Sequence, residues 1–481
     1  MVIYTVFVYN DTKNNITVKC RIFQGVTFYL TTQKEFFMAN ENKMGYLPIK
    51  KLILQMSLPP MCSMFLQYSY NLVDSMFVAN INENALAAVS LSFPITTLMI
   101  SLSIWIGVGI NVLIAGYLGE KEQDLADCAT TLGLLVALIV GICINILALL
   151  IMKPYFSAFT NNPAIFDYAM QYMSVCAFMQ VPNMVHIAIQ KVFQGTGNMI
   201  TPMWFQIAGV IFNFVFDPLL IFGIGPFPKM GIRGAALATV LGYALSMVIA
   251  FLLLVFTKQK VRIKIKGFHV DSHMLKNLFS YGFPSFVMNA LGSFMLTFTN
   301  LFLTAYSDTV VAFFGAYFKV QQMIFMTVNG LIQGCLPVMR FNYSAKQPER
   351  LKEAFHFGTQ AATVMMIGGT CLLLFLPKQI LFLFAASESM IKIGVPAMRI
   401  LSIGLVFCGF SIMIATYQQA IEKIRSSMLI HILRQGILLV PLMWLFNHMF
   451  GINGIWISFP VTEILVFIVA VLLQTVISKP Q

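Results

Sequence analysis

The chain has 481 residues, of which 58% are hydrophobic and only 10% are charged, and its formal net charge is +12. The mean hydropathy of +0.81 lies far above that of soluble globular proteins, so composition excludes a soluble enzyme or binding domain. The positive charge collects in loops between apolar segments, which indicates membrane topology and not a nucleic-acid partner. The chain is therefore expected to lie within a lipid bilayer.

Long uncharged segments predict membrane-spanning helices. Thr130–Met152 and Ala235–Thr257 carry no Asp, Glu, Lys or Arg, and a helix needs about 20 mostly apolar residues to cross the hydrocarbon core. No segment is long and polar enough to form a separate soluble domain. The pattern predicts an all-α integral membrane protein of about twelve helices, at residues 52–79, 85–115, 128–152, 165–188, 200–223, 234–257, 275–303, 309–338, 356–384, 394–419, 426–447 and 453–477.

Residues 1–43 precede the first span and are read as an extension without a fold. Met1–Phe37 mixes polar and aromatic residues and has no small-residue cleavage site after an apolar core, so a secretory signal peptide is not expected. Met1, Met38 and Met44 are all candidate start residues.

Basic residues mark one side of the membrane. Lys50 and Lys51 precede the first span, six Lys and Arg lie in the central loop 258–276, and more follow the eighth span in residues 340–352. The positive-inside rule therefore predicts that both termini and the central loop are cytoplasmic, as in a multi-pass plasma membrane protein. The opposite loops Asn80–Asn84, Tyr306–Asp308 and Asn447–Asn453 carry no Lys or Arg.

An internal repeat divides the chain. Gly107–Leu125 aligns with Gln333–Leu351, and Gly231-Ile-Arg-Gly-Ala aligns with Gly451-Ile-Asn-Gly-Ile at nearly the same offset. Parallel repeats of this kind place a substrate cavity between two lobes that rock to expose it alternately. We expect a six-helix N-lobe, a basic cytoplasmic linker and a six-helix C-lobe, at residues 44–257, 258–274 and 275–481.

Several motifs together carry a family resemblance. They are Met44-Gly-Tyr-Leu-Pro-Ile-Lys-Lys leading into Pro59-Pro60, Tyr70-Asn-Leu-Val-Asp74, Asn213-Phe-Val-Phe-Asp217-Pro with the later Gly231–Thr239, and Gln333-Gly-Cys-Leu-Pro337. The chain from about Lys43 to Ser478 resembles the DinF-like prokaryotic branch of the multidrug and toxic compound extrusion (MATE) family. Arg340 and Ser344 depart from it, since the family more often has glycine there.

Acidic residues within the spans are the strongest site candidates. Asp74 and Asp217 are among very few such acids, and a charge in lipid is unfavourable unless it is paired or functional. Asn213 shares a helix face with Asp217, and Thr239 is expected at a similar depth. The resemblance implies that Asp74, Asn213, Asp217 and Thr239 form a cation-coupling site, in which the first three could hold Na⁺ or the acids a proton. Simple helix-to-helix hydrogen bonding is the alternative.

The second half offers fewer polar residues. Lys319 and Glu463 are expected near mid-membrane, where they either pair with each other or line the cavity; a structural ion pair or a snorkelling lysine is the plainer alternative. The seventh and tenth spans contain no acid, so energy coupling is assigned to the first lobe. The candidate substrate-cavity residues are Lys319, Gln322, Gln333, Glu463, Tyr70 and Asn71.

The resemblance implies an antiporter, which we expect to be monomeric, that exports small amphipathic, often cationic, compounds in exchange for H⁺ or Na⁺. A lipid-linked oligosaccharide flippase of the same superfamily is the alternative; it would line its cavity with several arginines, whereas Lys319 is the cation that the pattern places clearly within the membrane. A membrane enzyme such as a prenyltransferase lacks support because no DDxxD motif is present. No Walker loop, cofactor motif or metal-binding Cys or His pattern is found.

Overall fold

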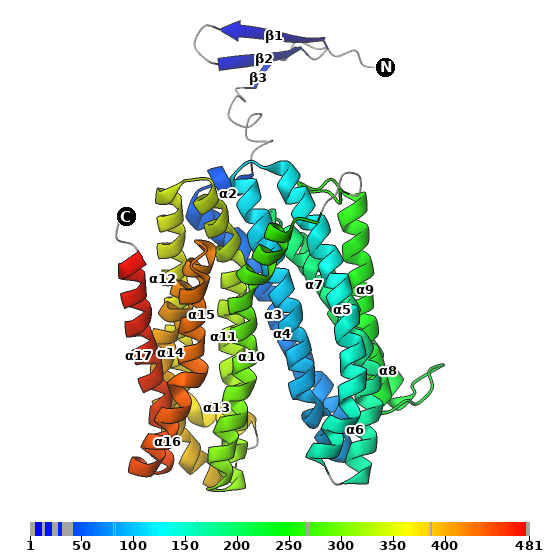
Figure 1. Ribbon diagram of the computed structural model, residues 1–481, viewed down its shortest axis with the longest axis vertical. Coiled ribbons are helices and arrows are strands. Elements are labelled where there is room, and N and C mark those ends of the chain that lie inside the picture. Colours follow the sequence, from blue (N-terminus) through cyan, green and yellow to red (C-terminus); the bar gives the residue numbers. More distant parts are fainter. Residues whose placement is uncertain are drawn as a thin grey trace.

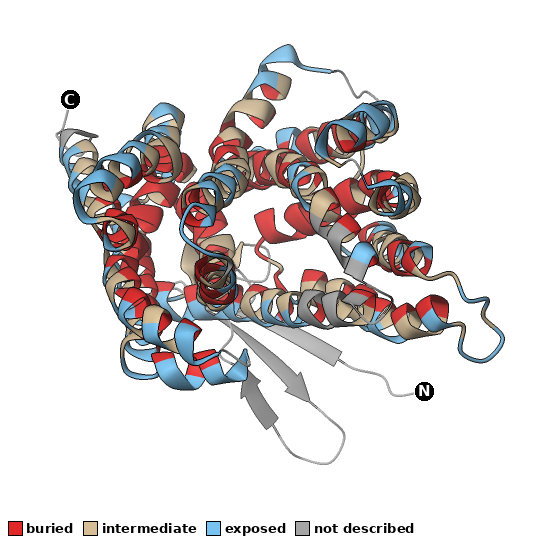
Figure 2. Cartoon of the chain, turned by 90° about the horizontal axis from the view of Figure 1, so that it is seen from below, coloured by how far each residue is buried: buried red, intermediate tan, exposed pale blue. Residues whose placement is uncertain are grey.

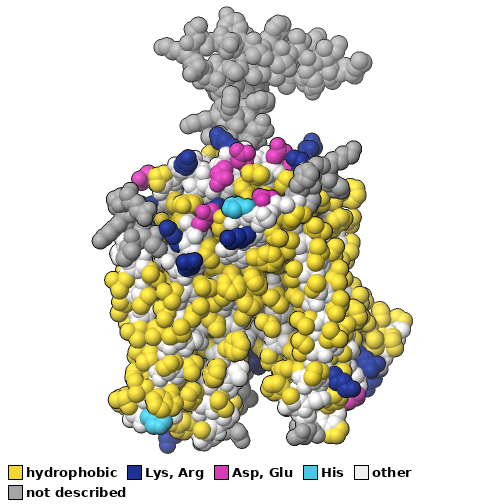
Figure 3. Space-filling view, viewed as in Figure 1, with side chains coloured by type: hydrophobic (Ala, Val, Ile, Leu, Met, Phe, Trp, Pro, Cys, Tyr) yellow, Lys and Arg dark blue, Asp and Glu magenta, His cyan; other side chains and the backbone are white. Residues whose placement is uncertain are grey.

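The computed structural model describes residues 5–11, 15–21, 27–30, 42–79, 81, 83–160, 162–264, 270–384 and 387–477. Its membrane body consists of long helices that stand side by side (Figure 1). Large hydrophobic side chains such as Leu150 and Phe256, 68% and 79% exposed, cover the outside of the bundle. In the space-filling view they form an apolar belt, and charged side chains gather mainly at the upper end (Figure 3). This surface is suited to contact with lipid.

The N-terminal extension differs from its prediction. Within residues 1–43, which were expected to have no fold, three antiparallel strands form in the order β1-β2-β3. Val8 lies opposite Val18, and Cys20 lies opposite Phe28. Their β-branched and aromatic residues favour paired strands, a signal that a search for membrane helices does not detect. The strands are β1 (Thr5–Asp11), β2 (Asn15–Arg21) and β3 (Thr27–Leu30).

The N-lobe follows a short helix, α2 (Lys43–Tyr46), which is capped by the side chain of Asn42. Its helix ends have local causes: Pro163 and the Asn162 cap begin α6, and left-handed Gly223 ends α8. The helices are α3 (Ile49–Ala79), α4 (Glu83–Gly119), α5 (Gln123–Phe159), α6 (Pro163–Cys176), which continues through the short η1 (Ala177–Met179) into α7 (Gln180–Gly195), α8 (Ile200–Phe222) and α9 (Ile232–Phe256).

The C-lobe begins after the linker with α10, whose N-cap is Asp271, and Ser307 and Ser387 cap two later helices. One crossing contains a π-helical turn, η2, between α15 and α16. The elements are α10 (Ser272–Thr304), α11 (Asp308–Ser344), α12 (Pro348–Phe375), α13 (Pro377–Leu383), α14 (Glu388–Ala420), α15 (Ile424–Ile432), η2 (Leu433–Ile437), α16 (Leu439–Phe450) and α17 (Ile452–Ile477).

The predicted spans all fall on helices. Among the described residues, eleven helical segments are long and apolar enough to cross a membrane, and α3, with 31 residues, makes the twelfth crossing of the bundle. The helices extend beyond most of the predicted limits. The largest consequence is in the fourth span, which was predicted to end at residue 188 but continues to Gly195, so that Lys191 lies on a helix.

Unusual backbone conformations confirm the internal repeat. Gly231 and Gly451 precede the last helix of each half, with φ, ψ values of 56°, −131° and 58°, −141°. Lys121 and Lys346, in the α4–α5 and α11–α12 turns, are both left-handed, with φ of 64° and 54°. Residues that are distant in sequence adopt the same rare conformation in corresponding turns. The two lobes are therefore built on one plan.

The lobes touch at one end of the bundle and separate at the other. We call the end that carries Lys50 and residues 258–264 the basic end. Near it, α4 of the N-lobe packs against α10 of the C-lobe. A Cβ on Gly109 would lie 2.0 Å from the Leu278 carbonyl oxygen, and a Cβ on Gly282 would lie 1.9 Å from that of Trp105.

The α4 and α10 backbones are therefore in direct contact at Gly109 and Gly282, and we call this contact the glycine seam. At the opposite end a notch separates the lobes (Figure 3). Seen from that end, the helices fall into two groups, with buried residues on the helix faces turned toward their neighbours (Figure 2). The notch is the entrance to an interlobe cleft, which the glycine seam closes at the basic end.

Candidate functional site

An acidic cluster forms where three N-lobe helices meet. Tyr70 and Asp74 lie one turn apart on α3, Asn213 and Asp217 lie one turn apart on α8, and Thr239 lies on α9. Asp217 is fully buried, and its Oδ2 accepts a hydrogen bond of 2.7 Å from the Tyr70 hydroxyl. We call these five residues the acidic cluster. The four residues predicted for cation coupling are thus brought together.

The Asn213 amide joins the cluster in either of its orientations. In one, Nδ2 donates to Thr239 Oγ1 at 3.4 Å. In the other, which suits its neighbours better, Nδ2 lies 3.0 and 3.1 Å from the two carboxylate oxygens of Asp217. The second orientation points the amide carbonyl oxygen toward the Tyr70 hydroxyl, 2.8 Å away. Asn213 therefore links Asp217 to the rest of the cluster.

Asp74 completes the cluster from α3. Its carboxyl group interacts directly with that of Asp217, and its Oδ1 is buried without a hydrogen-bond partner among the described residues. Two carboxyl groups can share a hydrogen bond only when at least one carries a proton. The surrounding ligand atoms are all oxygens apart from the amide nitrogen, which suits a hard cation. The cluster has the chemistry to hold a proton or a small cation.

The predicted role of Tyr70 in the substrate cavity does not match its position. Tyr70 is 8% exposed and is bound to Asp217, so it belongs to the acidic cluster. The sequence argument looked for charged residues within the spans, so it did not consider the hydrogen bond that the neutral Tyr70 hydroxyl can donate. The side chain of Asn71 lies outside the described residues.

For Lys319 and Glu463 in the C-lobe, the alternative in which they pair with each other is wrong. Glu463 pairs with Arg434, with 2.8 Å between Oε1 and Nε, and Arg434 also donates to Cys408 Sγ. Lys319 is exposed, and its backbone carbonyl accepts a hydrogen bond of 2.9 Å from the Tyr68 hydroxyl of the N-lobe. The Arg434 side chain is 6% exposed and that of Glu463 17% exposed, so the two charges compensate each other largely away from the surface.

Gln333 lies between the lobes, as expected for a cavity residue, whereas Gln322 is half-buried further along α11. The Gln333 side chain of α11 contacts Lys191 and Gln194 of α7. Lys191 was missed because the predicted span ended three residues before it. Together with Arg434, it also corrects the view that Lys319 is the clear intramembrane cation.

Arg340 lies close to the glycine seam. Its NH2 is 2.6 Å from Glu422 Oε1, and the Tyr281 hydroxyl donates to the same oxygen at 2.6 Å. A Cβ on Gly116 of the N-lobe would lie 2.7 Å from Arg340 Nε, so this glycine makes room for the guanidinium. Burial raises the pKa of Glu422, but Arg340 and Tyr281 lower it by more, and its net pKa is below the usual value.

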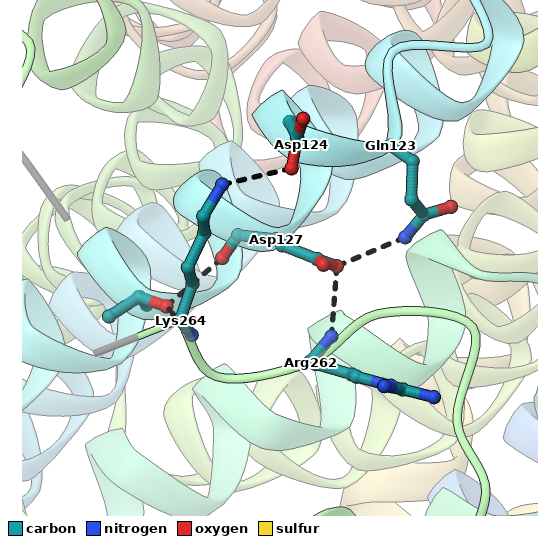
Figure 4. Close-up of polar contacts among 6 residues, drawn as sticks. Gln123, Asp124, Asp127, Arg262 and Lys264 are labelled. Carbon is teal, nitrogen blue, oxygen red and sulfur yellow. Dashed lines mark hydrogen bonds and ion pairs between the residues drawn. The ribbon is translucent and has the colours of Figure 1, made fainter. Parts of the chain in front are cut away.

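The linker is tied to the start of α5 (Figure 4). Asp127 Oδ1 accepts hydrogen bonds from the Arg262 backbone N–H at 2.9 Å and from Gln123 Nε2 at 3.0 Å. Lys264 Nζ lies 2.9 Å from Asp124 Oδ1, and this carboxylate raises the pKa of Lys264. Part of the basic charge of the linker is therefore paired with the N-lobe.

The described residues make twelve membrane crossings in two equivalent lobes, with a cleft between the lobes and a pair of facing acids in one of them, and these features define a polytopic membrane transporter. A family model described as MatE matches residues 59–219 and 284–445, one range in each lobe. The chain belongs to the MatE family, so the predicted family is confirmed. Members of this family are transporters, not enzymes.

Known relatives match over nearly their whole length. The FAD transporter of Shewanella oneidensis is 26% identical, over 90% of this chain and 96% of that protein. The multidrug export protein MepA of Staphylococcus aureus is 24% identical, over 89% and 93%. A solved multidrug resistance MATE family transporter, described as outward-facing, superposes with a TM-score of 0.85 at 25% identity, over 91% of this chain and 97% of that one.

Proposed function

We propose that the protein is a secondary active antiporter that exports amphipathic compounds, many of them cationic, in exchange for H⁺ or Na⁺. The observation that carries this proposal is the pair formed by half-buried Asp74 and fully buried Asp217, which lacks a basic partner among the described residues. Two facing carboxyl groups without a counter-ion favour uptake of a positive charge. The membrane potential and ion gradient can then act on that charge.

The coupling follows from the electrostatics of the acidic cluster. A proton or Na⁺ bound between Asp74 and Asp217 neutralises the pair and removes its attraction for a cationic substrate. The ion and the substrate therefore favour different states of the lobes, which makes their exchange obligatory. The closed glycine seam corresponds to a state in which the cleft opens away from the basic end.

We place both termini and the linker in the cytoplasm, with the protein as a monomer in the plasma membrane. The positive-inside rule supports this orientation, because the basic end carries most of the loop Lys and Arg residues. The cleft of the present state would then open to the outside.

Dye transport in everted membrane vesicles, where efflux from the cytoplasmic side appears as accumulation in the vesicle lumen, tests the proposal. We expect an imposed proton or sodium gradient to drive efflux of a cationic dye, and Asp217→Asn to abolish gradient-driven efflux. Asp167→Asn is the matched control, because Asp167 is an exposed acid of the same lobe. Wild-type vesicles in which neither gradient drives efflux, at protein levels matched by immunoblot, would contradict the antiporter assignment.

The relatives' names point to more than one substrate class. One is named for FAD, a dinucleotide with a diphosphate, and the other for drugs. We include phosphate-bearing flavins as a second candidate substrate class, because buried Lys191 lies at the interface of the lobes with neutral partners. The lipid-linked oligosaccharide flippase remains the alternative; it is less favoured because the buried Arg434 is already neutralised by Glu463.

A further inference from the structure

We propose that a cluster of amides around Lys191 is a subsite for a phosphate group of the exported substrate. The proposal rests on the transport function above and names one chemical class of its cargo. The cluster consists of Gln190, Lys191 and Gln194 on α7 and Gln333 on α11, and we call it the Lys191 cluster. It lies between the N-lobe and the C-lobe, on the interlobe side of both helices.

Three donors in this cluster converge on one oxygen. Gln333 Oε1 accepts hydrogen bonds from Lys191 Nζ at 3.0 Å, Gln194 Nε2 at 3.0 Å and Gln190 Nε2 at 3.4 Å. An ammonium group and two amides that point at a single acceptor form the arrangement that binds a phosphate oxygen. In the present state the Gln333 oxygen occupies the position that such an anion would take.

Hydrogen bonds to neighbouring side chains hold these donors in position. Lys191 Nζ also donates to Gln194 Oε1 at 2.8 Å, and Gln190 Oε1 accepts from Gln206 Nε2 of α8 at 3.1 Å. Lys191, Gln190 and Gln194 are at most 7% exposed. The three donors therefore stay aimed at the interlobe side when the acceptor moves.

Gln333 itself is weakly held. Its Nε2 donates only to the thioether sulfur of Met64, 3.0 Å away, and thioether sulfur is a weak acceptor. Both Gln333 and Met64 are half-buried, unlike the α7 donors. The Gln333 side chain can therefore swing away and leave its place to a ligand at small energetic expense.

The charge balance favours an anion. The ion pairs of the described residues are Lys264–Asp124, Arg340–Glu422 and Arg434–Glu463, and Lys191 takes part in none of them. A buried ammonium group with neutral partners alone is unfavourable compared with one that has an anionic partner. A phosphate of the substrate would supply the missing negative charge.

Flavin binding to the purified full-length protein in detergent tests this assignment. FAD and riboflavin share the same fluorescent ring system, but only FAD carries phosphate. We expect the wild type to bind FAD at least about tenfold more tightly than riboflavin, since a charge-assisted hydrogen bond contributes about 1.5–3 kcal/mol and 1.4 kcal/mol is a factor of ten. Lys191→Gln should remove this preference and leave riboflavin binding unchanged. Lys352→Gln, at an exposed lysine of α12, is the matched control and should behave as the wild type.

Two further variants protect the test against misfolding. Lys191→Arg keeps the charge and should keep the FAD preference. Gln333→Leu removes the oxygen on which the three donors converge, and it should keep or tighten FAD binding. Competition with ADP and with farnesyl diphosphate distinguishes the source of the phosphate, because one carries it on a nucleotide and the other on a lipid. The stronger competitor identifies the source.

Three results would overturn the subsite: a wild type without preference for FAD over riboflavin, a wild type that binds neither flavin nor diphosphate competitor, or a Lys191→Gln variant that keeps the preference. These outcomes are independent of any gradient. Failure of dye efflux in vesicles with intact FAD preference would instead contradict the antiporter function.

Discussion

The two lobes have the same arrangement of helices, but their membrane-embedded acids differ in whether they have a basic partner. In the N-lobe, Asp74 and Asp217 face each other without a basic partner among the described residues. In the C-lobe, Glu463 is paired with Arg434. The internal offset that relates Gly231 to Gly451 places Asn213 and Asp217 opposite residues 433 and 437, the ends of the π-helical turn that carries Arg434.

The comparison indicates which acids can gain or lose a proton or a cation during transport. A compensated ion pair within a lobe is a fixed part of the structure, since separating it leaves an unpaired charge in a low-dielectric interior. An uncompensated carboxyl pair can instead gain or lose a cation with little rearrangement of its neighbours. We therefore assign coupling to the N-lobe and a structural role to the Arg434–Glu463 pair.

The largest effect on stability is expected in the C-lobe. Arg434→Ala should lower the free energy of unfolding by about 3–5 kcal/mol, because it leaves the Glu463 carboxylate buried and unpaired. Replacing both residues, Arg434→Met with Glu463→Met, should restore most of that loss. Asp217→Asn should change stability little. Thermal unfolding of the purified variants in detergent measures all three, and a double variant less stable than Arg434→Ala would refute the pairing argument.

The next largest effect concerns the interlobe seam. Gly109→Ala should disfavour the state closed at the basic end by about 1–3 kcal/mol, because overpacking a tight contact is destabilising and the added Cβ would lie 2.0 Å from a backbone oxygen. Gly292→Ala on α10 is the control, since no atom lies within 4 Å of its Cβ position. Labelling of a cysteine introduced near the basic end should increase in the first variant only. Equal labelling in both would mean that the seam does not hold this end closed.

A smaller effect is expected from the Arg340–Glu422 pair. The folded-state pKa of Glu422 lies below its usual value of 4.5, so its contribution to stability is complete above that pH and disappears as the pH falls through the lower, folded value. Because Glu422 is 39% exposed, solvent screening limits the contribution to at most about 1 kcal/mol. Glu422→Gln should lower stability at neutral pH and flatten its decline below pH 4.5. Parallel unfolding curves for the two proteins across that range would contradict this origin.

The sequence predicted the membrane body well because lipid imposes simple rules. Long uncharged segments must be helices, and repeated loop motifs expose the two-lobe plan. The acidic cluster was also predictable, because Asp74 and Asp217 stand out against apolar neighbours. Tyr70 was placed in the wrong site, since its role depends on a hydroxyl that points at Asp217.

Other features depended on three-dimensional contacts. The partner of Glu463 was misassigned because similar depth does not decide which helix faces which, and Arg434 lies in an adjacent helix at a π-turn that no sequence pattern marks. Lys191 was missed because helices continue past the apolar segment when their polar ends are buried by other helices. The three-donor arrangement at Gln333 joins residues more than a hundred positions apart.

The central claim is that coupling resides in the uncompensated acids of the N-lobe and not in the paired charges of the C-lobe. The most direct test compares Asp217→Asn with the double variant Arg434→Met/Glu463→Met in reconstituted vesicles, measuring gradient-driven efflux and gradient-free exchange of one cationic dye. We predict that Asp217→Asn abolishes gradient-driven efflux, while the double variant retains both activities. Full gradient-driven efflux in Asp217→Asn, or its loss in a folded double variant that still exchanges dye, would contradict the account.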